Sequence, residues 1–387
     1  MVATPDRVRD RVYGPGEESA LRRDLTRLDR STLFYAVRSV NELLFVEDSA
    51  PVARTVTGSF TVSPRALTQL CNFLARGLNT TVRDICGADH TPGSSRAIYS
   101  PQEAKRIYNC VLRRRFTHRL STASILRSGT LIRAVVGGSY NRLPHGEFLD
   151  VVFDLASEKS ELEFSNAVLT AGILKVRYFQ RETYARHDKD EFLAGWQFTN
   201  GETGLASASV VALLAHKPSL AASRWSRTKS STEEAVRHDA ANLPVKLTQC
   251  FKQATAALWQ PERIQSAVAR SKDTPLGLGR RRHDADERRR NALAAALVYC
   301  GGHRWVPAAT ARAVVESAAA YGSALAPDLT PDRRELASRS VFDLVLALGR
   351  EARTTAPAVA SRMELAAREV LTGHFLLPPV EAEVHAS

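Results

Sequence analysis

The chain has 387 residues, of which 44% are hydrophobic and 24% charged, a balance that excludes wholesale disorder and indicates a folded globular protein. With 53 Lys and Arg against 41 Asp and Glu, its formal net charge is +12, which favours association with polyanions, above all nucleic acid. The sequence has neither a secretory signal nor an apolar run of the ~18 residues that a membrane span needs. Its five cysteines form no Cys-x-x-Cys pair. We therefore expect a soluble protein of a reducing cytoplasm, without a membrane partner or a disulfide framework.

Residues 1–40 are expected to form a charged, partly helical arm that Pro15-Gly16 interrupts. From Asn41 the pattern changes, and alternating apolar and polar residues predict half-buried strands over 43–48 and 53–63. Pro64 then stands at the first position of a predicted helix, where its missing N–H costs nothing.

A second helix is predicted to begin at Ser100-Pro101-Gln102-Glu103, because Ser100 caps the first turn and Glu103 can reach back to the N–H of the cap. The segment 101–142 is strongly basic, with Glu103 as its one acid. Its nine basic residues are Lys105, Arg106, Arg113, Arg114, Arg115, Arg119, Arg127, Arg133 and Arg142. The same segment contains a predicted strand that ends at Gly137-Gly138, and 147–155 is short and amphipathic.

Four apolar stretches predict a run of strands over residues 161–214, and Asn200-Gly201 connects the last two of them. Asn and Gly both accept positive φ, so this pair is a strong hairpin signal. We therefore expect a tight corner at Asn200-Gly-Glu-Thr-Gly204 rather than a phosphate-binding loop, whose lysine and glycine spacing it lacks.

After His216 the sequence becomes rich in Ala and Arg. Residues 217–240 are expected to be a mobile connection or an exposed helix. The run RRRHDADERRR at 280–290 is expected to be a solvated helix start or an auxiliary contact for nucleic acid or a partner.

Together these patterns predict an α+β fold: a mixed or antiparallel sheet with packed helices, followed by an α-helical C-terminal region. The predicted divisions are a charged arm over 1–40, an α+β core domain over 41–215, a basic helical or linker segment over 216–290, a helical region over 291–375 and a tail over 376–387.

The sequence contains no convincing catalytic constellation. Ser207 and Ser209 lack the Gly-x-Ser-x-Gly elbow of a nucleophile. A metal-dependent hydrolase built on His187, Asp188 and Asp190 is conceivable, but a solvated turn collects such residues by default. We expect no catalytic residue, no metal ligand and no cofactor, and interpret Asp150 and Asp154 as a surface pair on a helix.

The basic segment is the stronger indication of function. Arg and Lys attract a nucleic-acid backbone without reading its sequence, and aromatic rings stack on unpaired bases. Tyr140, at a turn, is expected either to be exposed for stacking or to belong to the core. The candidate nucleic-acid-binding residues are Lys105, Arg106, Arg113, Arg114, Arg115, Arg119, Arg133, Tyr140 and Arg142.

Several motifs occur in a familiar order. An Arg-Ala strand with a Tyr-containing turn is matched by Arg133-Ala134 and Tyr140, and an Asn-Ser-Glu-x-Gly turn by Asn200, Glu202 and Gly204. A C-terminal helix pair is matched within 343–366. The chain thus resembles, over roughly 40–215 and 335–372, a family of phage- and plasmid-borne proteins defined as a domain of unknown function. It departs from that family at Gly201, which stands where Ser is usual.

The resemblance implies a mobile-element setting in a bacterial host cell, where DNA-handling proteins are common. With the charge, it favours sequence-independent binding of DNA, single-stranded above all, in recombination, replication or maintenance, with a homo-oligomer as one possible state. The alternative is a non-catalytic structural or host-interaction protein of a phage. We also expect Glu202→Gln to be tolerated for folding.

Overall fold

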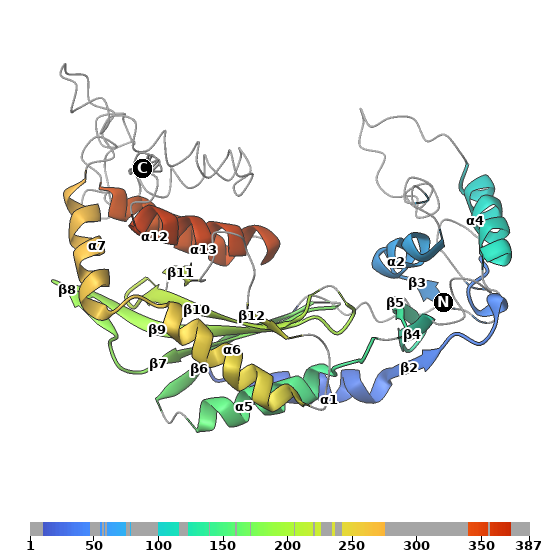
Figure 1. Ribbon diagram of the computed structural model, residues 1–387, viewed down its shortest axis with the longest axis horizontal. Coiled ribbons are helices and arrows are strands. Elements are labelled where there is room, and N and C mark those ends of the chain that lie inside the picture. The colour runs from blue at the N-terminus through green and yellow to red at the C-terminus, as the bar shows by residue number, and fades with distance from the viewer. Residues whose placement is uncertain are drawn as a thin grey trace, which may run out of the picture.

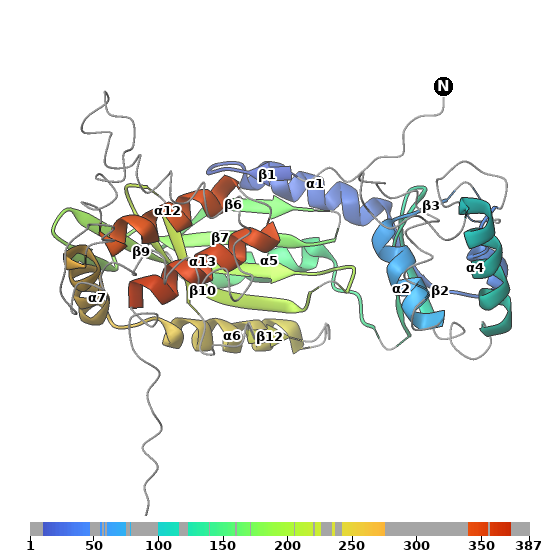
Figure 2. The same ribbon diagram turned by 90° about the horizontal axis from the view of Figure 1, so that it is seen from above.

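Two β-sheets and the helices that cover them make up the fold. The computed structural model describes residues 11–46, 55, 58, 60–74, 78, 100–115, 123–158 without 139, 161–225 without 171, 205 and 220, 234–236, 242–274, 340–354 and 357–372. Figure 2 shows a large sheet at one end of these residues and a small sheet with its own helices at the other. The predicted α+β fold with C-terminal helices is confirmed.

The large sheet is antiparallel throughout. Its main path runs in the order β1 (Arg11–Tyr13), β6 (Leu162–Leu169), β7 (Leu174–Gln180), β9 (Asp190–Asn200), β10 (Ala208–His216) and β11 (Ala221–Trp225). Two short strands lie off this path, β8 (Ala185–His187) beside β9 and β12 (Glu234–Val236) beside β10. The strands predicted over 161–214 are therefore confirmed, whereas part of the segment 217–240 forms strands instead of a mobile connection or a helix.

Helices cover both faces of this sheet, which explains why β10 is buried along its whole length. On one face Trp196 and Phe198 of β9 pack against Phe251 of α6 (Leu243–Ala257). Figure 1 shows α12 (Val341–Thr354) and α13 (Pro357–Thr372) on the opposite face. α5 (His145–Ser157) lies on the α6 side, and α7 (Pro261–Asp273) stands at the end of the sheet.

The small sheet has the order β2 (Thr32–Ala36), β4 (Ala123–Ser128), β5 (Leu131–Gly137) and β3 (Thr61–Val62). α2 (Pro64–Leu74) and α4 (Pro101–Arg115) pack with it around a second hydrophobic core that includes Leu70, Tyr108 and Ile125. The predicted cap of α4 is confirmed: the Glu103 carboxylate accepts from the Ser100 N–H at 2.8 Å, and the Ser100 hydroxyl accepts from the Glu103 N–H at 3.3 Å.

Of the strand predicted over 43–48, the structure describes residues 43–46, which contribute one isolated bridge, between Phe45 and Thr55. The reason is a side chain that takes the place of a strand partner. Asn109 of α4 accepts from the Phe45 N–H at 2.8 Å and donates to its carbonyl at 2.9 Å, and both residues are buried. The backbone of Phe45 is thereby satisfied without a sheet.

Residues 11–36 belong to both sheets rather than to a separate charged arm. β1 pairs with β6 of the large sheet, and β2 pairs with β4 of the small one. Between them, α1 (Glu18–Ser31) buries Leu21 and Leu25 in the main core. None of the helices that the structure describes is long and apolar enough to span a bilayer.

Replacing Asn109 by Ala should destabilise the protein, because the buried N–H and C=O of Phe45 lose their partners. At about 1–3 kcal/mol for each unsatisfied group, we expect a loss of at least ~2 kcal/mol in the free energy of unfolding, measured by urea denaturation. Asn141→Ala is the matched control, since Asn141 is exposed, and should change the free energy by less than about 0.5 kcal/mol. Equal effects would show that the amide of Asn109 does not hold Phe45.

Candidate functional site

The loop between β9 and β10 connects the two sheets. It runs over residues 201–207, so the hairpin is real but is not the tight Asn-Gly corner that the sequence predicted. Gly204 has a φ of 71°, as expected, whereas Asn200 ends strand β9 without a positive φ. Gln69 of α2 donates to the Thr203 carbonyl at 2.9 Å, and the Tyr140 hydroxyl donates to the Glu202 carbonyl at 2.9 Å. The loop is therefore docked on the small sheet.

Glu202, at the tip of this loop, is completely buried between two arginines. Its Oε1 accepts from Nε and Nη2 of Arg142 at 2.8 and 2.5 Å, and its Oε2 lies 3.1 Å from Nη2 of Arg133. Arg142 also donates to Asp29 of α1 at 3.2 Å. We call Asp29, Arg133, Arg142, His145, Asn200 and Glu202 the buried charge cluster.

A β-bulge aims Arg133 into this cluster. In the β4–β5 register Leu126 opposes Ala134 and Arg127 opposes Ile132, which leaves Arg133 as the extra residue on β5. A bulge breaks the strict alternation of faces and redirects a side chain. Arg133 as a residue is accordingly only 2% exposed, although the charge pattern of the sequence placed it on a solvated basic face.

Asn200 fixes the orientation of His145 in the cluster. The Asn200 amide nitrogen donates to the Leu143 carbonyl at 3.1 Å and lies 3.0 Å from Nδ1 of His145. Because the amide nitrogen can only donate, Nδ1 accepts, and the proton of a neutral ring sits on Nε2. That nitrogen lies 3.6 Å from Oε2 of Glu202.

The two carboxyl groups of the cluster differ in pKa. Burial raises the pKa of Glu202, but the opposing effects of His145, Arg133 and Arg142 outweigh it, so the net pKa is lowered and Glu202 is ionised. Burial, followed by the charge of Glu202, raises the pKa of Asp29 to about 6, against the N–H of Gly146 and the charges of Arg142 and Arg133.

Two carboxylates therefore balance two guanidiniums, and the partners come from α1, β5, the turn before α5 and the β9–β10 loop. This arrangement suits a structural connection between the two sheets better than a reactive centre, because both carboxylate oxygens of Glu202 already face a guanidinium. Gly201 has a role in the same loop. A Cβ at that position would lie 2.3 Å from the carbonyl oxygen of Ala206, so the Ser usual in the phage and plasmid family does not fit this loop as it stands.

The structure divides the candidate nucleic-acid-binding residues into two groups. Arg106, Arg113, Arg114 and Arg115 are exposed on α4. Lys105 and Arg133 are buried, so they do not belong to an exposed basic surface. Lys105 shares the spacing of the buried Tyr108, Asn109 and Leu112, a helical periodicity that could have revealed its burial from the sequence.

Arg142 and Tyr140 both contact the β9–β10 loop, which connects the two sheets. Arg142 binds Glu202, and Tyr140 is partly buried, with its ring edge-on to Phe34 and its hydroxyl held by the loop. Arg119 lies outside the described residues, as do the arginine run at 280–290 and the whole of the region 291–339.

The acidic residues that the sequence analysis singled out lie on α5 and around the turn between β8 and β9. Asp150 and Asp154 are exposed on α5, as expected of a surface pair, and Asp150 accepts from Arg22 at 2.9 Å. His187 and Asp188 border a turn, and among the described residues no group of three or more His, Cys, Asp or Glu side chains could hold a metal ion. Asp190, in contrast, binds His216 and Lys272, a pairing that the sequence analysis missed.

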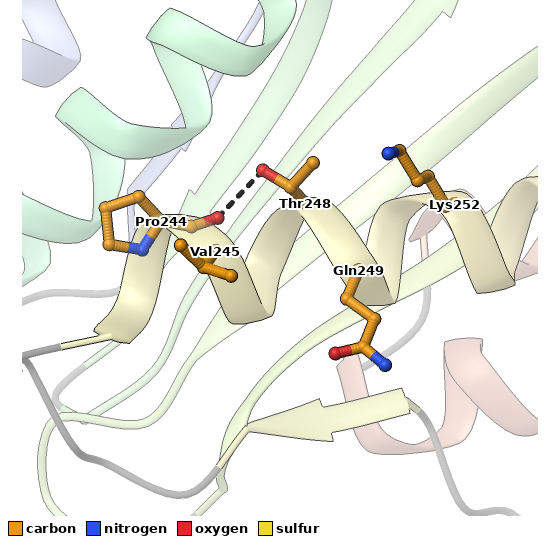
Figure 3. A pocket seen from close by; sticks show the side chains of 5 residues that line it. All are labelled: Pro244, Val245, Thr248, Gln249 and Lys252. Carbon is orange, nitrogen blue, oxygen red and sulfur yellow. Dashed lines mark hydrogen bonds between the residues drawn. The ribbon is translucent and has the colours of Figure 1, made fainter.

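An open groove of about 390 Å³ runs along α6 and is lined by Pro244, Val245, Thr248, Gln249 and Lys252 (Figure 3). Thr248 donates to the Pro244 carbonyl, and Val245 is 71% exposed. All lining residues come from one helix, and Lys252 is the only charged group among them, so the groove offers no catalytic arrangement.

The geometry defines a two-sheet α+β protein with a buried charge cluster between the sheets and a basic helix at one end. Comparisons with family models, with curated proteins and with solved structures gave no match. The resemblance to phage- and plasmid-borne proteins therefore rests on the motif residues. Five of these lie in or beside the buried charge cluster: Arg133, Tyr140, Asn200, Glu202 and Gly204.

Replacing Glu202 by Gln should destabilise the protein, contrary to the tolerance expected from the sequence, because the buried guanidinium of Arg133 and the partly buried one of Arg142 lose their shared counter-charge. We expect the free energy of unfolding to fall by about 3 kcal/mol in urea titrations. The control is Glu163→Gln, which breaks an exposed pair with Arg181 and should cost less than about 1 kcal/mol. A Glu202→Gln protein as stable as the control variant would show that the buried charge cluster does not stabilise the fold.

The raised pKa of Asp29 predicts a pH-dependent difference between the wild type and Asp29→Asn. A carboxyl whose folded pKa lies above its unfolded value stabilises the fold at low pH, and this contribution is lost as the pH rises from about 4 through 6. Asp29→Asn should therefore gain stability relative to the wild type between pH 4.5 and 7.5, measured as the difference in Tm. A difference that is independent of pH would contradict the raised pKa.

Proposed function

We propose that this protein binds nucleic acid, single-stranded DNA above all, through the exposed arginines of α4. The setting we propose is recombination, replication or maintenance of a phage or plasmid in the cytoplasm of a bacterial host. The observation that supports this function is the cluster of Arg106, Arg113, Arg114 and Arg115 on one exposed helix. Phosphate contacts by arginine do not read sequence, so binding of this kind is sequence-independent.

The net positive charge of the chain is concentrated in the sequence segment that contains this helix. Residues 32–138, which contain the small sheet, α2 and α4, carry 14 Lys and Arg against 6 Asp and Glu, a net charge of +8. The other 280 residues carry 39 Lys and Arg against 35 Asp and Glu, a net charge of +4. Lys and Arg are about equally frequent in both parts, so the difference in net charge comes from the scarcity of Asp and Glu in residues 32–138 and not from additional arginine.

The arginines at the end of α4 are available for a ligand. None of the ion pairs between described residues involves Arg113, Arg114 or Arg115. Basic residues in the last turn also stabilise a helix through its dipole, by about 0.3–1 kcal/mol each. At 3.6 residues per turn, three consecutive arginines spread over about 200° of the helix surface. This spread is wider than stabilisation of the helix dipole requires.

The test is a salt titration of binding to single-stranded DNA, with duplex DNA and single-stranded RNA in parallel. Arg113→Ala/Arg114→Ala/Arg115→Ala should flatten the slope of log K against log salt by about 2, at ~0.7 per phosphate contact. The matched control is Arg23→Ala/Arg27→Ala/Arg30→Ala, which removes the same charge from the exposed side of α1 and should leave the slope unchanged.

Equal losses in both triple variants would mean that only net charge matters and that α4 is not the interface. Failure of the wild type to bind any of the three nucleic acids at low salt would refute the proposal. That result would favour the alternative, a structural or host-interaction protein. The mass of the free and bound protein in the same samples reports whether it assembles as a homo-oligomer.

A further inference from the structure

A chain of hydrogen bonds links a serine, a histidine and an aspartate at the end of the large sheet opposite the small one. Ser219 lies in the turn between β10 and β11, and its Oγ is 2.8 Å from Nδ1 of His216. Nε2 of His216 is 2.8 Å from Oδ1 of Asp190, the first residue of β9. None of these residues belongs to the buried charge cluster or to α4.

The proton positions in this chain follow from its neighbours. Lys272 of α7 lies 2.5 Å from Oδ2 of Asp190; although burial raises the pKa of Asp190, its bonds to Lys272 and His216 lower it on balance. An ionised carboxylate accepts, so Nε2 of His216 carries the proton and Nδ1 is free to accept the hydroxyl proton of Ser219. Burial is the main cause of the lowered pKa of His216, which keeps the ring neutral.

The imidazole is held in place on several sides. His216 is 2% exposed, and the rings of Phe192 and Phe342 lie 5.5 and 6.0 Å from its own, measured between centroids. Ser219 is only partly buried. A neutral, oriented imidazole beside the hydroxyl of a partly exposed serine is the arrangement that activates a serine nucleophile.

We propose that Ser219 is a nucleophile for acyl esters, with His216 as its general base and Asp190 as the group that orients the imidazole. Oγ of Ser219 bonds to the carbonyl carbon while its proton passes to Nδ1 of His216. The imidazolium then returns this proton to the leaving alcohol as the C–O bond of the ester breaks. Water, activated by the same imidazole, hydrolyses the acyl-serine and restores the hydroxyl.

Arg353 of α12 indicates the class of substrate. Its Nη1 donates to the carbonyl of Ser219 at 3.2 Å, which places an exposed guanidinium beside the nucleophile. A cation at this position stabilises the negative charge that develops on the ester carbonyl oxygen, and it attracts an anionic acyl group. Esters whose acyl part carries a carboxylate therefore fit this site better than neutral ones.

Ser219 also has a local structural contact, since its Oγ accepts from the Ala221 N–H at 3.3 Å. A purely structural hydroxyl would not react faster than other serines, so reactivity separates the two roles. The experiment treats the full chain with a fluorophosphonate probe, whose phosphorus binds the serine oxygen as fluoride leaves, and maps the adduct by peptide mass spectrometry. We expect one adduct, on Ser219, and none on Ser157, an exposed serine at the end of α5 that serves as the control.

Asp190→Asn and His216→Gln should slow the labelling of Ser219 by about 100-fold, the contribution of a general base. No adduct on Ser219, equal labelling of Ser157, or an unchanged rate in both variants would overturn the proposal. If either variant unfolds, Ser219→Cys replaces it. Its thiol should react with iodoacetamide at least about tenfold faster than the exposed Cys110, and equal rates would also overturn the proposal.

Discussion

The burial of one carboxylate governs the arrangement of the two sheets. Removing Glu202 and its two arginines from water costs several kcal/mol per ion, and that cost is offset only when all the partners stand in place together. Those partners belong to the large sheet, the small sheet and the segment that connects them. The buried charge cluster therefore forms only when both sheets and the segment between them are in place. The relative position of the sheets is thus part of the folded state rather than a consequence of a flexible linker.

Periodicity predicted the parts of this fold that depend on local sequence. Alternating residues over 161–214 indicated the strands of the large sheet, and Ser100 with Glu103 indicated the start of α4. The segment 217–240 was misread because its strands are short and depend on β10 for pairing. Phe45 was misread because its partner is a side chain 64 residues away. Neither pairing leaves a local trace in the sequence.

The candidate site was harder to predict because charge alone does not distinguish a buried arginine from an exposed one. Arg133 and Arg113 look alike in composition, but a bulge directs the first to Glu202, 69 residues further along the chain. The motif that carried the resemblance, Asn200 with Glu202 and Gly204, did indicate an important loop. Its role in joining two sheets follows only from contacts that the sequence does not show.

The pairing of β1 with β6 has a consequence for synthesis on the ribosome. Arg11 pairs with Leu169, so the N-terminal strand leaves the exit tunnel long before its partner exists. The small sheet, whose last strand ends at Gly137, can form in that interval. The apolar side of α1, including Leu21 and Leu25, meanwhile faces water until the main core assembles. Chaperone capture of a nascent chain would therefore be directed to α1.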